Sequence, residues 1–134
     1  MHSHGARRCD EAGLATLALV LIIPAVVALV AAVAQYVVYY HADHLALAAA
    51  QEAVRAAQLA DGTEAVAQAQ TEDFIDQAGS RLLLDPQVVV SRDEVAQVAR
   101  AEVRARVPQV LPGFSIVLAA RASGPLERFE ASGP

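Results

Sequence analysis

Two histidines and an aspartate, close together in the first third of the chain, are the residues best suited to chemistry. His41 and His44 are spaced to share one face of a helix, with Asp43 between them, and paired imidazoles on one face can bind zinc. A third ligand from Glu52 would lie at least two helical turns away. Zinc sites normally show at least three convincing ligands, so we interpret the group as polar anchoring at a membrane edge. We expect no metal and no other cofactor.

The element that positions these residues is a long apolar run immediately before them. From Leu14 to Ala34 no side chain is charged, and the hydroxyl of Thr16 is the single polar side-chain group. Wound as a helix, about 20 residues match the roughly 30 Å hydrocarbon core of a bilayer. Lipid favours a helix because it offers no partner to open backbone groups, and membrane helices tolerate a proline such as Pro24, usually with a kink. We therefore predict a transmembrane helix over residues 14–40.

The far edge of this run has the composition of a membrane interface. Tyrosine rings suit that level because the ring is buried while the hydroxyl stays wet; the tyrosines here are Tyr36, Tyr39 and Tyr40. Two other interpretations stay open. One is the buried core helix of a soluble protein, and the other is a cleaved secretory signal peptide, with which the small residues of 31–34 are loosely compatible.

Arginines on either side of the span predict its orientation. Arg7 and Arg8 directly precede the run, whereas the next arginine after it is Arg55. Positive charges near a span tend to stay inside. We expect residues 1–13 to form a disordered cytoplasmic stub, and residues 41–134 to be extracytoplasmic, in a single-pass protein of the cell membrane.

Composition excludes several classes of function. The 134 residues include no lysine and carry a formal net charge of −5, so no basic cluster is present to track nucleic-acid phosphates. Cys9 is the single cysteine and cannot form an intramolecular disulfide. The sequence contains no glycine-rich phosphate loop, nucleophile elbow or CxxC pair. We expect neither an enzyme nor a small-molecule substrate.

Beyond the span, helix-forming residues continue to about Leu59, so one helix is predicted from Leu14 onward, standing out of the membrane as a stalk. Its small residues suggest close packing against helices of other proteins; these are Ala25, Ala28, Ala32, Ala49, Ala53 and Ala56. Asp61-Gly62 should end the helix.

A second helix is expected over 64–78, with Thr63 as N-cap and Gly79 as the C′ residue. Its apolar stripe is predicted to include Val66, Ala69, Phe74 and Ile75.

The last third of the chain changes to strand-like patterns. Residues 88–90 form a β-branched run, and residues 99–107 alternate apolar with charged side chains, which favours a half-buried strand. Residues 93–106 also fit an amphipathic helix, and we prefer the strand. A third strand is expected over 114–122, with Phe114, Ile116, Leu118 and Ala120 on one face, ended by Gly124-Pro125. The predicted fold class is α+β, with about three antiparallel strands packed on a helix.

Taken in order, these features resemble the TadE-like family of pilus assembly proteins, the minor pseudopilins of tight-adherence (Tad) pili. The resemblance covers nearly the whole chain. It depends on the basic stub, the apolar run opened by residues 13–16, Pro24, and the alanine-rich helix through 41–52. Residues 107–113 and 122–129 are similar to the C-terminal pattern of the family. The resemblance implies that the helix packs with pilin-like or other pilus assembly proteins.

The sequence departs from that family at the processing signal. Members often carry a glycine before the cut made by a prepilin peptidase and a glutamate five residues after it. Counted back from Pro24, Gly13 falls on the glycine position, so cleavage would fall between Gly13 and Leu14. Ala18 stands where the glutamate is expected, which makes this a weak processing site.

Two functions from different classes follow. The first is a single-pass minor pseudopilin or assembly factor of a Tad-type pilus, acting through helix packing and so linked to secretion and cell adhesion. The second is a single-pass membrane adaptor whose extracytoplasmic domain binds a protein partner without entering a filament. A membrane-bound hydrolase is a much weaker third.

Overall fold

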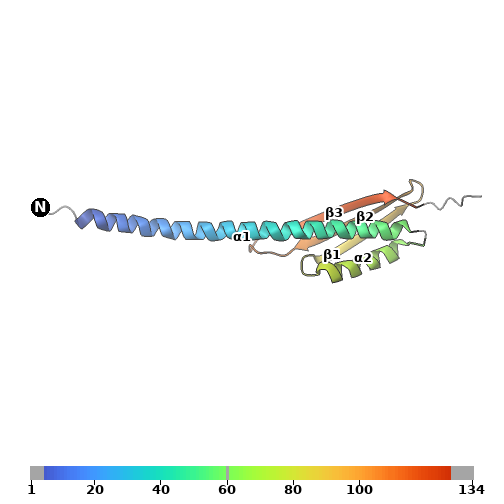
Figure 1. Ribbon diagram of the computed structural model, residues 1–134, viewed down its shortest axis with the longest axis horizontal. Coiled ribbons are helices and arrows are strands. Elements are labelled where there is room, and N and C mark those ends of the chain that lie inside the picture. Colours follow the sequence, from blue (N-terminus) through green and yellow to red (C-terminus); the bar gives the residue numbers. More distant parts are fainter. Residues whose placement is uncertain (1–4, 60, 128–134) are drawn as a thin grey trace, which may run out of the picture.

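The structure, a computed structural model, describes residues 5–59 and 61–127, and the side chains within them from residue 13 onward. Two helices precede a three-stranded sheet (Figure 1), which confirms the predicted α+β class. In chain order the elements are α1 (Gly5–Gln58), α2 (Glu64–Gly79), β1 (Leu84–Asp93), β2 (Val98–Val107) and β3 (Ile116–Pro125).

Helix α1 dominates the shape of the molecule. Its 54 residues reach about 80 Å at 1.5 Å per residue. The expectation of a disordered segment before the span is wrong from Gly5 onward, because the alanine and arginines that follow it are good helix formers and extend the helix backward. Residues 1–4 lie outside the described residues. The helix also continues through Pro24 and ends at Gln58, close to the predicted end.

Helix α2 begins as predicted but buries a different face. Thr63 is the N-cap, with extended backbone, and its hydroxyl accepts a hydrogen bond of 3.2 Å from the amide of Val66. The predicted stripe is wrong at Val66 and Ala69, both of which are exposed. The buried residues are spaced four apart and are Ala67, Thr71 and Ile75. The helix is therefore rotated relative to the prediction, and the polar Thr71 is accommodated because its hydroxyl donates to the carbonyl of Ala67 at 2.7 Å.

The end of α2 also differs from the prediction. Gly79 belongs to the helix, and Ser80 in right-handed helical conformation is the C-cap, so Gly79 is not a C′ residue. Glycine allows a close approach here, since a Cβ at this position would lie 2.5 Å from Leu45 Cδ2 of α1 and the leucine side chain would have to shift. The absent side chain lets the two helices pack together at this level.

The three strands form one antiparallel sheet in the order β1-β2-β3. The preference for a strand over a helix at 93–106 is confirmed for β2, with residues 94–97 forming the turn before it. Strand β1 is longer than the predicted 88–90 at both ends. Its added residues continue the backbone pairing with β2, and the polar side chains among them are exposed or half-buried. Its irregular start is marked by Asp85, which has a φ of 47°.

Strand β3 begins and ends later than predicted. Ile116, Leu118 and Ala120 do share the inner face, but Phe114 lies outside the strand and is exposed. The predicted break at Gly124-Pro125 is wrong, because these residues pair with Ala99 and Val98 of β2. Proline is tolerated there since β3 is an edge strand and its outward side needs no donor.

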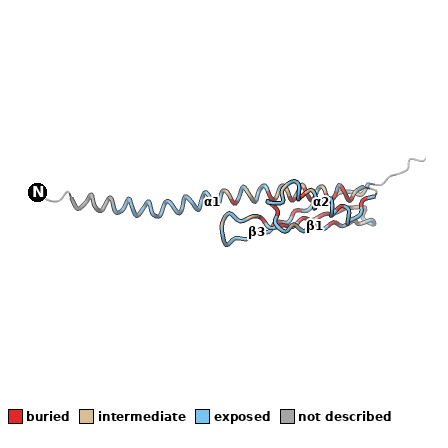
Figure 2. The backbone as a smooth tube through the Cα atoms, turned by 90° about the horizontal axis from the view of Figure 1, so that it is seen from below, coloured by how far each residue is buried: buried red, intermediate tan, exposed pale blue. Residues whose placement is uncertain are grey.

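Both helices pack on one face of the sheet, α1 against β2 and β3 and α2 against β1 and α1. We call α2, the sheet and residues 35–58 of α1 the head. Its core is built largely from small residues (Figure 2), which let helix and sheet approach closely. Ala49, Ala53 and Ala56 belong to this core, with exposed fractions of 0%, 0% and 5%. The outer part of α1 is therefore not a bare stalk, and these three alanines are covered by the chain itself rather than by a helix of another protein.

Candidate functional site: the membrane edge and the open sheet face

The part of α1 before the head, residues 14–34, carries its apolar side chains in the open. We call it the membrane half. Figure 2 shows this stretch as exposed along its length apart from partial burial near the head, and Leu21 is 68% exposed. The helix is long and apolar enough to cross a membrane, and none of its most apolar 18-residue window is buried. Exposed aliphatic side chains on this scale are costly in water. The arrangement fits a single-pass membrane protein and not the core helix of a soluble one.

The candidate processing position lies inside this helix. Gly13 is exposed, and a Cβ added there would meet open space. Packing therefore gives no reason for a glycine at this position. Leu14 and Ala18 are likewise exposed on continuous helix. Processing between Gly13 and Leu14 stays a prediction.

The histidines lie just beyond the membrane half and contact an aromatic ring. The rings of Tyr40 and His44 meet edge to face with centroids 4.3 Å apart, and those of Tyr36 and Tyr40 stack at 6.4 Å. His41 and His44 are exposed, while Asp43 is half-buried. Among the side chains that the structure describes, in residues 13–59 and 61–127, no group of three or more histidine, cysteine, aspartate or glutamate residues is placed to hold a metal ion. The histidines and tyrosines form an amphipathic strip suited to an interface.

A buried glutamine joins this level of the helix to the far end of the sheet. Gln35 is 8% exposed, and its Oε1 accepts from the amide of Val110 at 2.7 Å and, at 3.4 Å, from that of Leu111. Its Nε2 donates to the carbonyl of Pro108 at 3.2 Å. One side chain thus satisfies three backbone groups of the β2–β3 connection, residues 108–115, and fixes this loop against α1.

Sequence analysis missed this contact. In the sequence Gln35 is simply the first polar residue after the apolar run, and its partners lie more than 70 residues further along the chain. No local pattern relates the two segments. The available signal was weak: an amide at the hydrocarbon edge, and a distant loop with two prolines and a glycine.

An open, apolar groove lies between the helix and this loop, with a volume of about 500 Å³. Its helix side is formed by Ala32, Gln35, Tyr36 and Tyr39. Its loop side is formed by Leu111, Phe114, Ser115 and Ile116. The groove therefore spans the boundary between the membrane half and the head.

The opposite end of the head is fixed by a second glutamine and an arginine. Gln58 Nε2 donates to the carbonyl of Pro125 at 2.7 Å, joining the end of α1 to the end of β3. The Arg92 guanidinium donates to the carbonyls of Leu59 and Gly62, and its backbone amide donates to Glu64 Oε1 at 2.8 Å. A cation at the C-terminal end of α1 is favourable because it meets the negative end of the helix dipole.

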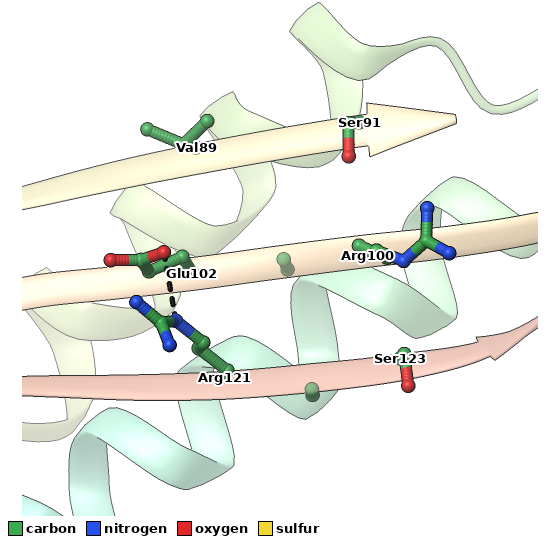
Figure 3. Close-up of a pocket in the computed structure, with 8 residues that line it drawn as sticks. Val89, Ser91, Arg100, Glu102, Arg121 and Ser123 are labelled. Carbon is green, nitrogen blue, oxygen red and sulfur yellow. Dashed lines mark hydrogen bonds and ion pairs between the residues drawn. The ribbon is translucent and has the colours of Figure 1, made fainter. Parts of the chain in front are cut away.

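The sheet face that no helix covers carries an arginine ladder. Along β2, three arginines alternate with inward apolar residues, and β3 adds another; they are Arg100, Arg104, Arg106 and Arg121. In Figure 3 the carboxylate of Glu102 lies beside Arg121, whose Nε donates to Oε2 at 3.0 Å. Arg104 donates to the other oxygen. Hydrogen bonds first from Arg121 and then from Arg104 hold the pKa of Glu102 below its ordinary value.

This face also has a shallow depression of about 480 Å³ beside the ion pairs. Its walls include Val89, Ser91, Arg100 and Ser123 (Figure 3). Val89 and Val117 are each 64% exposed on this face. The surface combines cationic and apolar side chains.

Comparison with protein-family models, with curated proteins and with solved structures found no match to this chain.

Proposed function

We propose that the chain is a minor pseudopilin or assembly factor of a Tad-type pilus, inserted by a single span with its N-terminus in the cytoplasm and its head outside. The resemblance of the sequence to the TadE-like family motivates the pilus assignment. The observation that carries the proposal is one continuous helix whose membrane half is bare while its outer half is packed by the head. Such a helix can join a bundle of other helices within the membrane without disturbing the head.

The helix packing that this function needs is assigned to the membrane half. Ala49, Ala53 and Ala56 are already covered within the chain. Ala25, Ala28 and Ala32 are exposed, and three- and four-residue spacing puts them on one side of α1. In lipid, small residues promote association because they let helix backbones approach closely.

Crosslinking in native membranes tests this assignment. With a photoreactive side chain at Leu29, the parent should crosslink to pilin-like single-span proteins. Ala28→Leu should weaken that crosslink while leaving insertion intact, because leucine is apolar and helix-forming. Val30→Leu is the matched control, since it adds bulk on the opposite side of the same turn and should have no effect. Equal crosslinking by the parent and both variants, with normal pili, would mean that the helix is only an anchor, and the adaptor function would be preferred.

The orientation has its own test. Ser91 is exposed on the open sheet face, so a Ser91→Cys substitution in a Cys9→Ser background offers one accessible thiol. An impermeant thiol reagent should label it on intact cells. Labelling that requires lysis would place the head in the cytoplasm.

The membrane adaptor is the second candidate, and the open sheet face favours it. Val89 and Val117 are exposed there among arginines, on the face turned away from α1. If the adaptor function holds, Val117→Glu should abolish partner binding while Ala28→Leu leaves it unchanged. The pseudopilin function predicts the reverse ranking, so the two variants measured side by side decide between the candidates.

A further inference from the structure

The β2–β3 loop carries apolar side chains that the head leaves uncovered. Phe114 is 66% exposed and Val110 is 44% exposed, and both stand outside the strands. The loop is locally well defined: Pro108 and Pro112 interrupt strand pairing, and Gly113 turns the chain at a φ of 92°, which favours glycine. Its apolar residues are therefore presented outward by a fixed turn.

The position of the loop along α1 places these side chains at a membrane boundary. The apolar run ends at Ala34, and the next residue, Gln35, holds the loop by its three backbone hydrogen bonds. Headgroup regions extend roughly 5–7 Å beyond each side of the hydrocarbon core, or about four residues of helix. The loop thus lies level with the interface when α1 spans the bilayer. Figures 1 and 2 show it as the end of the head nearest the membrane half.

The neighbouring surface continues the same chemistry. The groove beside the loop runs from Ala32, inside the apolar run, past Tyr36 and Tyr39 to Phe114. The apolar surface of the span is therefore continuous with the loop along this groove, and the amide of Gln35, which also lines it, is satisfied by the loop itself.

We infer that the β2–β3 loop is a second membrane contact, which inserts Val110 and Phe114 into the outer leaflet interface beside the span. The occupant of this surface is lipid: headgroups around the loop backbone and acyl chains against Phe114 and the groove. The loop and α1 together then hold the head at a fixed height and rotation on the bilayer. A single helix would leave the head free to rotate about the helix axis. The inference requires that α1 spans a membrane but is independent of which protein it assembles with.

Depth-dependent quenching tests this contact. The full chain, in a Cys9→Ser background, would carry one environment-sensitive fluorophore and be reconstituted in phosphatidylcholine vesicles with nitroxide lipids of shallow or deep label. The probe at Ser115→Cys leaves Val110 and Phe114 in place. Its matched control is Ser123→Cys, an exposed serine toward the far end of β3. Shallow nitroxides should quench the probe at 115 several-fold more than the probe at 123.

Two further variants separate the possible failures. A probe at Val30→Cys reports the span, and deep nitroxides should quench it. If position 30 is quenched while 115 and 123 respond alike, the loop inference is wrong and the span stands. Adding Phe114→Ser to the 115 probe should lower its quenching, and the thermal midpoint should not change because the ring lies outside the core. Undiminished quenching would mean that Gln35 merely holds the loop near the bilayer and that Phe114 does not insert, which would overturn the inference. Shielding of the 115 probe that depends on the protein-to-lipid ratio would assign the surface to a second copy, and would also overturn the inference.

Discussion

The two halves of α1 use alanine in opposite ways. In the outer half, alanines at one face of the helix disappear into the head, and Ala46, Ala50 and Ala53 have no exposed surface. In the membrane half, alanines of similar spacing stand open beside leucine, valine and isoleucine. Alanine therefore packs inside the protein in the outer half of α1 and lies on an exposed surface in the membrane half.

The difference shows what alanine spacing can establish. Small residues at three- and four-residue intervals indicate close packing, but they do not identify the partner. In the outer half the partner is the sheet and α2, because the chain returns along the helix and water drives apolar surface together. Over residues 14–30 of the membrane half no part of the described chain covers the helix, so any partner there must be lipid or another molecule.

The largest expected effect is the loss of membrane insertion when the membrane half is altered. Leu21→Arg should abolish insertion, because a central arginine costs at least about 2.5 kcal/mol on insertion scales. Gln51→Arg places the same side chain on the exposed side of the outer half and should insert normally. Fractionation and carbonate extraction of membranes measure both variants. If Leu21→Arg remains fully membrane-integrated, this stretch does not span.

A smaller effect is expected on the stability of the head when the outer half of α1 is altered, with no change in the membrane half. Ala53→Leu forces three extra carbon atoms into a closed helix–sheet contact, and overpacking of this kind typically costs about 1–3 kcal/mol. The thermal midpoint of the detergent-solubilised chain, followed by circular dichroism, should fall by roughly 4–8 °C for each kcal/mol. Ala28→Leu is the matched control and should leave the midpoint unchanged. Equal destabilisation by both would mean that the two halves are not packed differently.

The sequence was sufficient to predict the elements whose patterns are local. Hydropathy identified the long apolar helix, Thr63 marked the start of α2, and the strict alternation of residues 99–107 identified β2. It was insufficient where a distant contact decides the outcome. Val66 faces water because the helix face that contains Ala67 packs against α1 and the sheet. Gly79 lies against Leu45 of α1, and it does not serve to end its own helix.

The same limit explains what was missed at the candidate site. Gln35 looks like any polar residue at the end of a span until its partners at 108–111 are brought beside it by the β2–β3 turn. The arginines of β2 were visible as the polar phase of a strand. The pairing of Glu102 with Arg121 of β3 could not be predicted, because Arg121 reaches Glu102 only through the register of β3 against β2.

The smallest expected effect concerns charge on the open sheet face, which has no counterpart in the uncharged membrane half. Arg121 and Arg104 lower the pKa of Glu102, so its ionised form favours the folded state. This contribution is fully present above the ordinary carboxyl pKa of about 4.3 and is lost as pH falls through the lower folded-state pKa. Glu102→Gln should therefore lower the thermal midpoint slightly at pH 7, and the difference from the parent should shrink as pH falls below 4.

A matched charge control makes that small effect interpretable. Asp76→Asn removes one carboxylate from the exposed side of α2 and changes the net charge equally. Thermal midpoints of the parent and both variants, measured from pH 7 to pH 3 in the same detergent, provide the comparison. If the two variants track each other, only net charge matters. A gap that closes toward low pH for Glu102→Gln alone would assign the stabilisation to the ion pairs across β2 and β3. Exposed ion pairs contribute little and are screened by salt, so the gap should also narrow at high ionic strength.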